Sequence, residues 1–350
     1  MPTFNRRNFL LAAAGSPFAR RLSEAEAPLS EAVRAGKLRA AVLMVATGRQ
    51  RFTRAFGEAA PDTVFLLASV TKPMTAAVMM RLVDEGQLKL DDPVSRHLPE
   101  LDGERAAITV RQLLNHTSGL PDMPPDNLEL RKRHAPLSEF LRSALTVPLR
   151  NPPGTEVHYQ SMGFLVAAVL AENVVGRPFP EQMRQVLFRP LRMASASLGL
   201  GGRGLAGTAR CQVPDDPGGW NSPYWRNLGS PWGGAHGNAA DVTRLLRAFA
   251  SGQAATLSRA GTAAMLAPSP PERHSGQPKR EHYGLGWRLG IGGRGCSPAT
   301  FGHSGATGVT AWMDPRRDLS CVLLTTLPSA ESQATLLGPV SDAVAAALRP

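Results

Sequence analysis

The chain has 350 residues and a 43% hydrophobic composition, which is enough to bury a large core in one or two domains. Its formal net charge is +11, but the basic residues are scattered and no nucleic-acid-binding motif occurs, so we expect no nucleic-acid partner. No apolar stretch is long enough for a transmembrane helix, and no His or Cys cluster has metal-ligand spacing, so we expect no membrane span, metal or other cofactor. The three cysteines contain no C-x-x-C pair and do not indicate a disulfide framework.

The N-terminal segment 1–27 is similar to a twin-arginine export signal. Arg6 and Arg7 precede a short apolar run, and we expect cleavage near Ala25 or Ala27. This pattern predicts a periplasmic or extracellular protein. The alternative is a cytoplasmic protein with a disordered basic tail.

The next part of the chain predicts a short helix, a hairpin and a longer helix. Residues 29–35 favour a helix that ends at Gly36, and strands 40–46 and 51–56 flank a turn. Residues 70–85 have apolar side chains at helical spacing, and Gly86 ends that helix.

Helix signals then dominate the middle of the chain. Thr109 and Gln112 form a predicted capping box, and Ser138 is expected to cap a helix that runs to Leu145. Residues 162–173 form another predicted helix, stopped near Gly176. Further predicted helices begin with Pro180 in the first turn and with Asn238 as the cap.

The C-terminal part returns to strands. Residues 283–291, 310–314 and 319–326 are strand-like, and 336–348 form a closing amphipathic helix. Strands near both ends predict an α+β fold with one antiparallel sheet flanked by helices, plus a helical lobe. Within a domain of residues 28–348, the sheet lobe takes about 28–68 and 280–348, and the helical lobe about 69–279.

Ser69 and Lys72 are the first candidates for catalysis. Residues three apart on a helix lie on one face, so the Lys72 amine can reach the Ser69 hydroxyl and take its proton. Pro73 places Ser69 close to the start of that helix, where the helix dipole favours an alkoxide.

Two further motifs follow in the chain. Tyr159, two residues before Ser161, lies at the start of a predicted helix and could relay a proton. His303, Ser304 and Gly305 lie on a predicted strand, where Gly305 allows close approach of a substrate and the next amide could face an oxyanion.

These motifs, taken in this order, resemble the serine β-lactamase-related family, in particular its class C-like branch of β-lactamases, penicillin-binding proteins and esterases. The stretches 65–73, 88–93 and 108–120 look like that family as well. The resemblance implies a β-lactamase/transpeptidase-like fold with the site between two lobes. It implies attack by Ser69 to give an acyl-enzyme, proton transfer by Lys72 and Tyr159, and an oxyanion hole made by the amides of Ser69 and Ala306.

Two positions depart from the family pattern. Ser161 stands where the second motif commonly ends in Asn, and His303 stands where the third commonly begins with Lys. A neutral His does not hold a substrate carboxylate as a Lys cation does. Both changes favour a carboxylesterase acting on a small ester. The alternatives are a β-lactamase, a D-alanyl-D-alanine carboxypeptidase or D-amino peptidase, and a non-catalytic penicillin-binding-like sensor.

Other readings are weaker. An α/β-hydrolase requires G-x-S-x-G, which the sequence lacks. A Gly/Pro-rich stretch carries the aromatic residues Trp220, Tyr224, Trp225 and Trp232, which either line the substrate pocket or hold a loop to the core.

Overall fold

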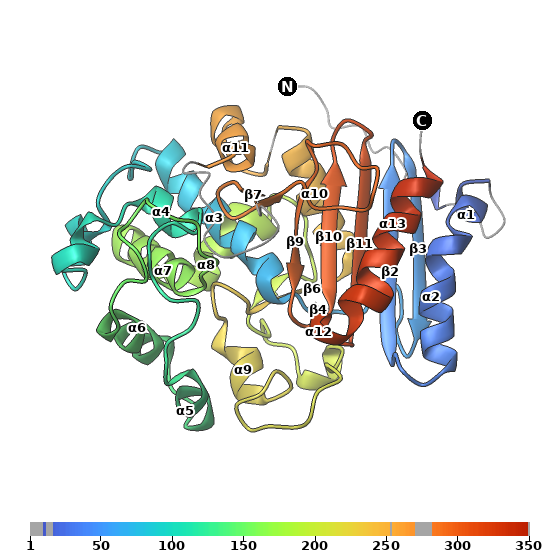
Figure 1. Ribbon diagram of the computed structural model, residues 1–350, viewed down its shortest axis with the longest axis horizontal. Helices are drawn as coiled ribbons and strands as arrows, with labels where there is room; N and C mark the ends of the chain where they lie inside the picture. The colour runs from blue at the N-terminus through green and yellow to red at the C-terminus, as the bar shows by residue number, and fades with distance from the viewer. Residues whose placement is uncertain (1–9, 12–16, 253, 270–281, 349–350) are drawn as a thin grey trace.

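The computed structural model describes residues 10–11, 17–252, 254–269 and 282–348. Arg6 and Arg7 of the predicted export signal lie outside these residues. The described part is built around one large sheet with helices on both faces and a mainly helical lobe beside it (Figure 1). The α+β fold class is therefore confirmed.

The large sheet combines strands from both ends of the chain, as expected. Its spatial order is β1-β3-β2-β11-β10-β9-β8-β7, and every pair is antiparallel except β1 with β3, which run parallel. The strands are β1 (Leu10–Leu11), β2 (Ala40–Thr47), β3 (Gln50–Gly57), β7 (His282–Tyr283), β8 (Arg288–Leu289), β9 (Phe301–Gly305), β10 (Val309–Asp314) and β11 (Leu319–Thr325).

Both faces of this sheet are covered, which explains why β2 is apolar throughout. Val42 and Met44 pack into the core shared with the helical lobe. Ala41, Leu43 and Val45 point the other way, into a second core. Successive side chains of a strand alternate between the two faces, so a strand buried on both faces has no polar alternation.

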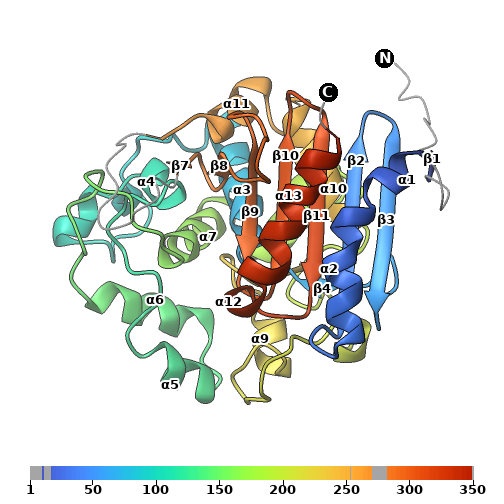
Figure 2. The ribbon, with the colours of Figure 1, turned by 45° about the vertical axis from the view of Figure 1, so that its right-hand side comes forward.

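Three helices provide this cover. α2 (Ser23–Arg34) and α13 (Gly338–Ala347) lie next to each other on one face, and α10 (Ala239–Ala250) lies on the opposite face (Figures 1 and 2). Part of the segment 69–279 therefore packs on the sheet, although we expected that whole segment in the helical lobe.

The packed structure begins before residue 28. α1 (Pro17–Arg21) leads into α2, and Phe18, Leu22 and Ala25 are buried in the second core. These residues belong to the segment 1–27 predicted as an export signal. The signal itself remains a prediction.

The other helices are mostly in the helical lobe. Around them are 3₁₀ turns at Ala68–Val70, Val94–Arg96, Gly103–Ala107 and Leu205–Gly207, and π turns at Arg184–Phe188 and Gln333–Leu337. The helices are α3 (Thr71–Asp84), α4 (Val110–Leu114), α5 (Asn127–Lys132), α6 (Leu137–Thr146), α7 (Met162–Val175), α8 (Phe179–Met183), α9 (Pro223–Leu228), α11 (Arg259–Leu266) and α12 (Ser329–Ser332).

Most of the predicted helix ends are confirmed. Thr109 and Gln112 make the capping box of α4, the Asn238 side chain caps α10, and Gly176 ends α7 in a left-handed conformation. The predicted cap at Ser138 is wrong, because α6 already begins at Leu137 and Pro136 precedes it. Pro136 takes the N-cap position there, without a side-chain hydrogen bond to the first turn.

The predicted strand 283–291 is also interrupted. β7 and β8 are separated by a turn in which Gly286 has a φ of +76° and its amide donates to the Leu114 carbonyl at 2.8 Å. Because Gly286 bonds to the helical lobe, the chain leaves the large sheet between β7 and β8.

A second, three-stranded sheet was not predicted. It contains β4 (Phe65–Leu66), β6 (Ala235–Gly237) and β5 (Ser197–Leu198), in that order. Its strands are too short to produce a periodic sequence pattern. It joins the chain just before Ser69 to the segment just before α10.

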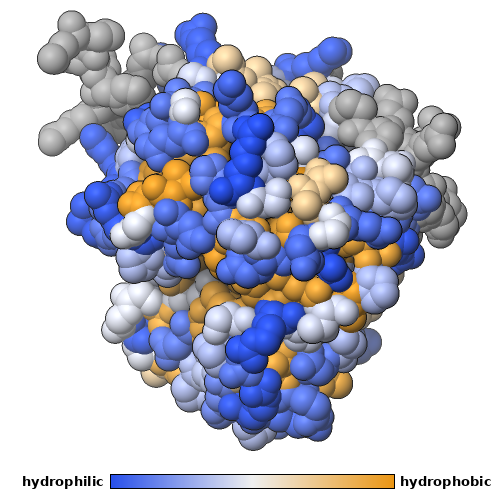
Figure 3. Space-filling view, turned by 90° about the vertical axis from the view of Figure 1, so that its left-hand side faces the viewer, coloured by the Kyte–Doolittle hydropathy of each residue, from blue (hydrophilic) through white to orange (hydrophobic). Residues whose placement is uncertain are grey.

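Within the described ranges, no single helix is long and apolar enough to cross a membrane, although α7 and residues 179–188 pass that test together as a pair bent by 87°. The face of the helical lobe is largely hydrophilic, with apolar side chains visible mainly in furrows (Figure 3). Cys211, Cys296 and Cys321 are free thiols.

Candidate active site

Ser69 lies in a tight turn at the entrance to α3. The 3₁₀ turn Ala68–Val70 runs directly into the helix, and Ala68 has a φ of +45°, a conformation that costs a non-glycine residue roughly 1–3 kcal/mol. Thr71 holds the turn in place, because its hydroxyl donates to the Ala68 carbonyl at 2.7 Å and accepts from the Ala235 amide at 3.0 Å. These two hydrogen bonds thus hold the strained turn that carries Ser69 against the start of α3.

Lys72 is fully buried one turn away. Its Nζ lies 3.4 Å from Ser69 Oγ, 3.1 Å from Ser161 Oγ and 3.3 Å from the Trp232 carbonyl oxygen. Burial lowers the pKa of Lys72 to about 7, against an opposing effect of the nearby Asp122 carboxylate. An amine with this pKa is partly neutral near pH 7 and can accept a proton.

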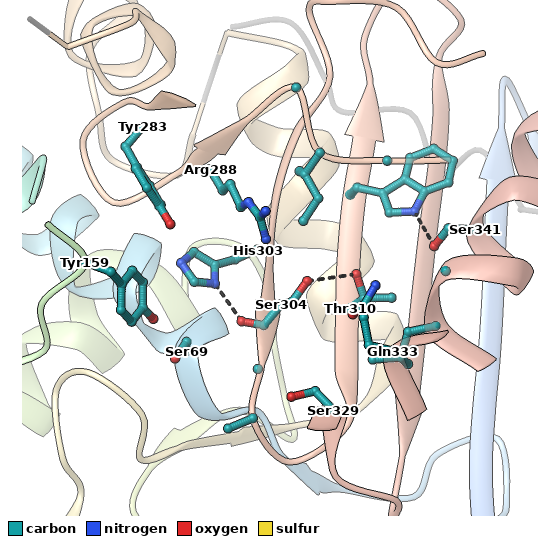
Figure 4. A pocket seen from close by; sticks show the side chains of 18 of the residues that line it. Ser69, Tyr159, Tyr283, Arg288, His303, Ser304, Thr310, Ser329, Gln333 and Ser341 are labelled. Atoms are coloured by element: carbon teal, nitrogen blue, oxygen red, sulfur yellow. Dashed lines mark hydrogen bonds between the residues drawn. The ribbon is translucent and has the colours of Figure 1, made fainter. Parts of the chain in front are cut away.

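Tyr159 covers the same amine from the other side. The Lys72 Nζ lies 4.5 Å from the centre of the Tyr159 ring, and that ring stacks on His116 at 4.7 Å between centroids. Figure 4 shows the Tyr159 hydroxyl turned toward Ser69. The structure thus brings Ser69, Lys72 and Tyr159 together.

The third motif lies on β9, at the edge of the same cavity. A Cβ on Gly305 would lie 2.6 Å from the Leu67 carbonyl oxygen and 2.9 Å from the Ala68 Cβ. The close approach at Gly305 is therefore made by the turn that carries Ser69, whereas we had expected a substrate there. Ala306 follows directly, so the two amides predicted for the oxyanion hole come from adjacent segments.

His303 and Ser304 form part of the cavity wall. His303 Nδ1 lies 2.7 Å from the Ser304 carbonyl oxygen, which can only accept, so Nδ1 carries the proton. Its buried Nε2 has no hydrogen-bond partner in the described structure. Burial, with a smaller contribution from the Lys72 charge, lowers the pKa of His303 to about 3. His303 is thus neutral across the physiological range.

The cavity has a volume of about 700 Å³ and extends from Ser69 across β9 and β10 to α13 (Figure 4). Its side chains are mostly polar. Ser304 Oγ lies 3.3 Å from Thr310 Oγ1 in its wall, and Ser329, Gln333 and Ser341 line the far end. Arg288 from β8 lies in the same cavity, beside His303.

The aromatic stretch does not line this cavity in the described structure. Trp225 and Trp232 are buried in the core, and the Tyr224 hydroxyl donates to the Ala135 carbonyl at 2.7 Å. Trp225 also lies under the Arg131 guanidinium, 4.2 Å from its ring centre. Of the two readings, the loop held to the core is the one seen, and Trp232 contributes only its backbone carbonyl to the site.

Several site residues were missed from the sequence. Asp122 accepts a hydrogen bond from Ser161 Oγ at 2.6 Å, and His116, Tyr283 and Arg288 surround the motif residues. His116 lies inside the stretch 108–120 that carries the family resemblance, which was its only signal. Among the described residues, no group of His, Cys, Asp and Glu could hold a metal ion.

Comparisons with known proteins place this chain in a family. The Beta-lactamase family model matches residues 24–344. Esterase EstB of Burkholderia gladioli is 34% identical over 195 residues, which are 48% of this chain and 49% of the esterase. Protein flp of Staphylococcus aureus (strain COL) is 28% identical over 170 residues, which are 45% of this chain and 34% of that protein. The chain thus spans less than half the length of each of these relatives.

A solved structure agrees along most of the chain. EstCE1, described as a hydrolase with promiscuous acyltransferase activity, has a TM-score of 0.80 at 22% identity, over 95% of this chain and 100% of its own. That likeness shows the fold. The match of the family model over most of the sequence shows the family as well: this chain belongs to the Beta-lactamase family and has the β-lactamase/transpeptidase-like fold.

Proposed function

We propose that the chain is a carboxylesterase that works through an acyl-enzyme. The observation that carries this proposal is the buried contact of Lys72 with Ser69, beneath the Tyr159 ring. Ser69 Oγ attacks the ester carbonyl and transfers its proton to the Lys72 and Tyr159 pair. The amides of Ser69 and Ala306 stabilise the oxyanion.

The two half-reactions balance without any other reagent. When the ester C–O bond breaks, the proton taken from Ser69 passes to the oxygen of the leaving alcohol. Water then attacks the acyl carbon, the bond to Ser69 Oγ breaks, and the acid leaves while Ser69 regains a proton. Lys72, with its pKa lowered to about 7, can accept a proton and release it again within each half-reaction.

His303 supports an ester as the substrate. A β-lactam or a D-alanine terminus brings a carboxylate, which a cation at the start of the third motif would bind with a charge-assisted hydrogen bond worth about 1.5–3 kcal/mol. Since the pKa of His303 is lowered to about 3, this residue provides no such cation at pH 7 or at pH 5.5. A simple ester has no carboxylate to hold. The similarity to Esterase EstB also supports this assignment.

The nucleophile is tested by covalent labelling. A fluorophosphonate should add one label per chain to the wild-type protein, as read by mass spectrometry of the intact chain. Ser69→Ala should lose both the label and several orders of magnitude in ester hydrolysis, whereas the exposed Ser251→Ala should keep both. An unlabelled wild-type protein would support the sensor alternative instead.

The substrate class is tested by kinetics at two pH values. We expect kcat/KM for p-nitrophenyl butyrate to exceed that for nitrocefin at pH 7 and also at pH 5.5, because His303 remains neutral at both. A larger value for nitrocefin at pH 7 would refute the ester assignment.

One observation favours a second candidate function. Arg288 lies in the cavity beside His303, and a guanidinium is a suitable partner for a substrate carboxylate. A β-lactamase or D-alanyl peptidase would use it in this way. In that case Arg288→Gln would reduce nitrocefin hydrolysis at least about tenfold and leave the hydrolysis of neutral esters unchanged.

A further inference from the structure

Asp122 is connected to the catalytic centre by two hydrogen bonds from a single residue. Ser161, at the start of α7, donates through its hydroxyl to Asp122 Oδ1 at 2.6 Å and through its amide to the Asp122 carbonyl at 3.2 Å. The same Ser161 Oγ lies 3.1 Å from Lys72 Nζ. One hydroxyl therefore separates the carboxylate from the buried amine.

The direction of these hydrogen bonds follows from the number of protons. Ser161 Oγ has one proton, and an ionised carboxylate can only accept, so that proton points to Asp122. The lone pairs of the hydroxyl then face Lys72, which must donate. A hydroxyl that donates to a carboxylate is a better acceptor for a second donor, because chains of hydrogen bonds polarise one another.

We propose that Asp122 is a positioning residue for the catalytic centre. Acting through the Ser161 hydroxyl, its carboxylate holds the Lys72 side chain next to Ser69 and favours the protonated form of the amine. A Ser and Asp pair thus provides the acceptor that Lys72 contacts.

Three other groups that face Lys72 do not supply a negative charge. Tyr159 presents its ring, and His116 and His303 face the amine from the end of α4 and from β9. Burial lowers the pKa of both histidines, so they remain neutral where Lys72 titrates. The Asp122 charge is the one that opposes the effect of burial on the pKa of Lys72.

A direct titration of Lys72 tests this proposal without substrate. The chain has five lysines, so ¹³Cε-lysine labelling gives a simple NMR spectrum in which Lys72→Arg identifies the resonance. We expect Asp122→Asn to lower the pKa of Lys72 by about half a unit or more, since it removes a neighbouring opposite charge. Asp122→Glu, which keeps the charge, should restore most of the wild-type value.

Matched controls separate a local effect from a general change in charge. Asp126 is an exposed carboxylate in the same loop whose side chain accepts from Ser143, so Asp126→Asn should leave the Lys72 titration unchanged. In a Ser161→Ala background, the effect of Asp122→Asn should become smaller, because the connecting hydroxyl is gone. A Lys72 titration equal in Asp122→Asn and wild type, or an equal shift in Asp126→Asn, would overturn the proposal.

The role of Lys72 as a base rests on the proposed function, and a kinetic measurement tests that part separately. If Lys72 is the base, the acid limb of the pH profile of kcat/KM for p-nitrophenyl butyrate should move to lower pH in Asp122→Asn, in step with the NMR titration. An NMR shift without a kinetic shift would support the positioning role of Asp122 and refute Lys72 as the base.

Discussion

At the scale of single residues, the site is maintained at a cost to stability. Lys72 is fully buried with no carboxylate in direct contact, and burial lowers its pKa from 10.5 to about 7. Each unit of such a shift corresponds to about 1.4 kcal/mol of stability lost while the amine is charged in the folded state. Ala68 adds backbone strain next to the nucleophile.

Lys72→Met should therefore stabilise the fold, and the gain should depend on pH. Below pH 7 the wild-type amine is charged in both the folded and the unfolded state. The folded state then carries the full free-energy penalty of burying that charge. Between about pH 7 and 10.5 the folded protein has already released the proton that the unfolded chain still binds, and the penalty declines. We expect a gain of up to a few kcal/mol at pH 6 and a smaller one at pH 9.

Chemical denaturation of both proteins at the two pH values measures this difference. Lys72→Met leaves the Trp232 carbonyl without its donor at either pH, so the comparison between pH values matters more than the absolute gain. A gain that is the same at pH 6 and pH 9 would show that Lys72 keeps its proton in the folded protein over this whole range, so that its pKa is not lowered to about 7.

At the scale of elements, the site depends on how closely β9 lies against the turn before α3. Gly305 has no side chain to keep the strand away from Leu67 and Ala68, and Thr307 on the next turn donates to the Leu66 carbonyl at 2.7 Å. Two segments that are more than 200 residues apart in the chain are fixed against each other here. Their amides can act on one oxyanion only while this contact is kept.

Gly305→Ala should disturb this contact and thus activity. The added methyl would lie 2.6 Å from the Leu67 carbonyl oxygen, so the backbone must move. We expect a loss of about 10–100-fold in kcat/KM for the best ester and of about 1–3 kcal/mol in the free energy of unfolding. Gly204→Ala is a suitable control, because a Cβ there meets no atom within 4 Å. Equal activity of the two variants would contradict the assigned contact.

The elements that the sequence predicted correctly are those whose signals are local. The hairpin of β2 and β3, the capping box at Thr109 and the stop at Gly176 each depend on a few neighbouring residues. The interruption after β7 was missed because it depends on a contact of Gly286 with Leu114 in another lobe.

The same distinction applies to the site. Ser69 and Lys72 are recognisable because they are three residues apart, and the 3₁₀ turn that continues into α3 brings two such residues together. Asp122 belongs to a proline-rich loop with no periodic pattern, and it meets Ser161 only because the loop folds back on the start of α7. Contacts between distant segments decide that part of the site, and a single sequence contains no spacing that encodes them.

At the scale of the whole molecule, two cores share one sheet. One lies between the sheet and the helical lobe and includes α3 and α7, and the other lies under α2 and α13. The second core joins the first helices of the chain to the last. Its inner residues include Leu22, which precedes the cleavage expected near Ala25 or Ala27.

A substitution at Leu22 therefore tests whether residues 1–27 are a removable leader or part of the folded domain. It is fully buried in the second core together with Leu43 and Leu323, so Leu22→Ala should lower the free energy of unfolding of the full chain by about 2–5 kcal/mol. Leu128→Ala is the control, because Leu128 is 64% exposed and its truncation removes little buried surface.

Denaturant titration of the three proteins gives the comparison. If Leu22→Ala is as stable as the wild type, residues before 28 do not contribute to the second core, and the sheet and α13 must be stable without them. If it is destabilised as expected, removal of residues 1–27 would open the core beneath α2. Any cleavage compatible with the observed packing would then have to occur before α1 begins at Pro17.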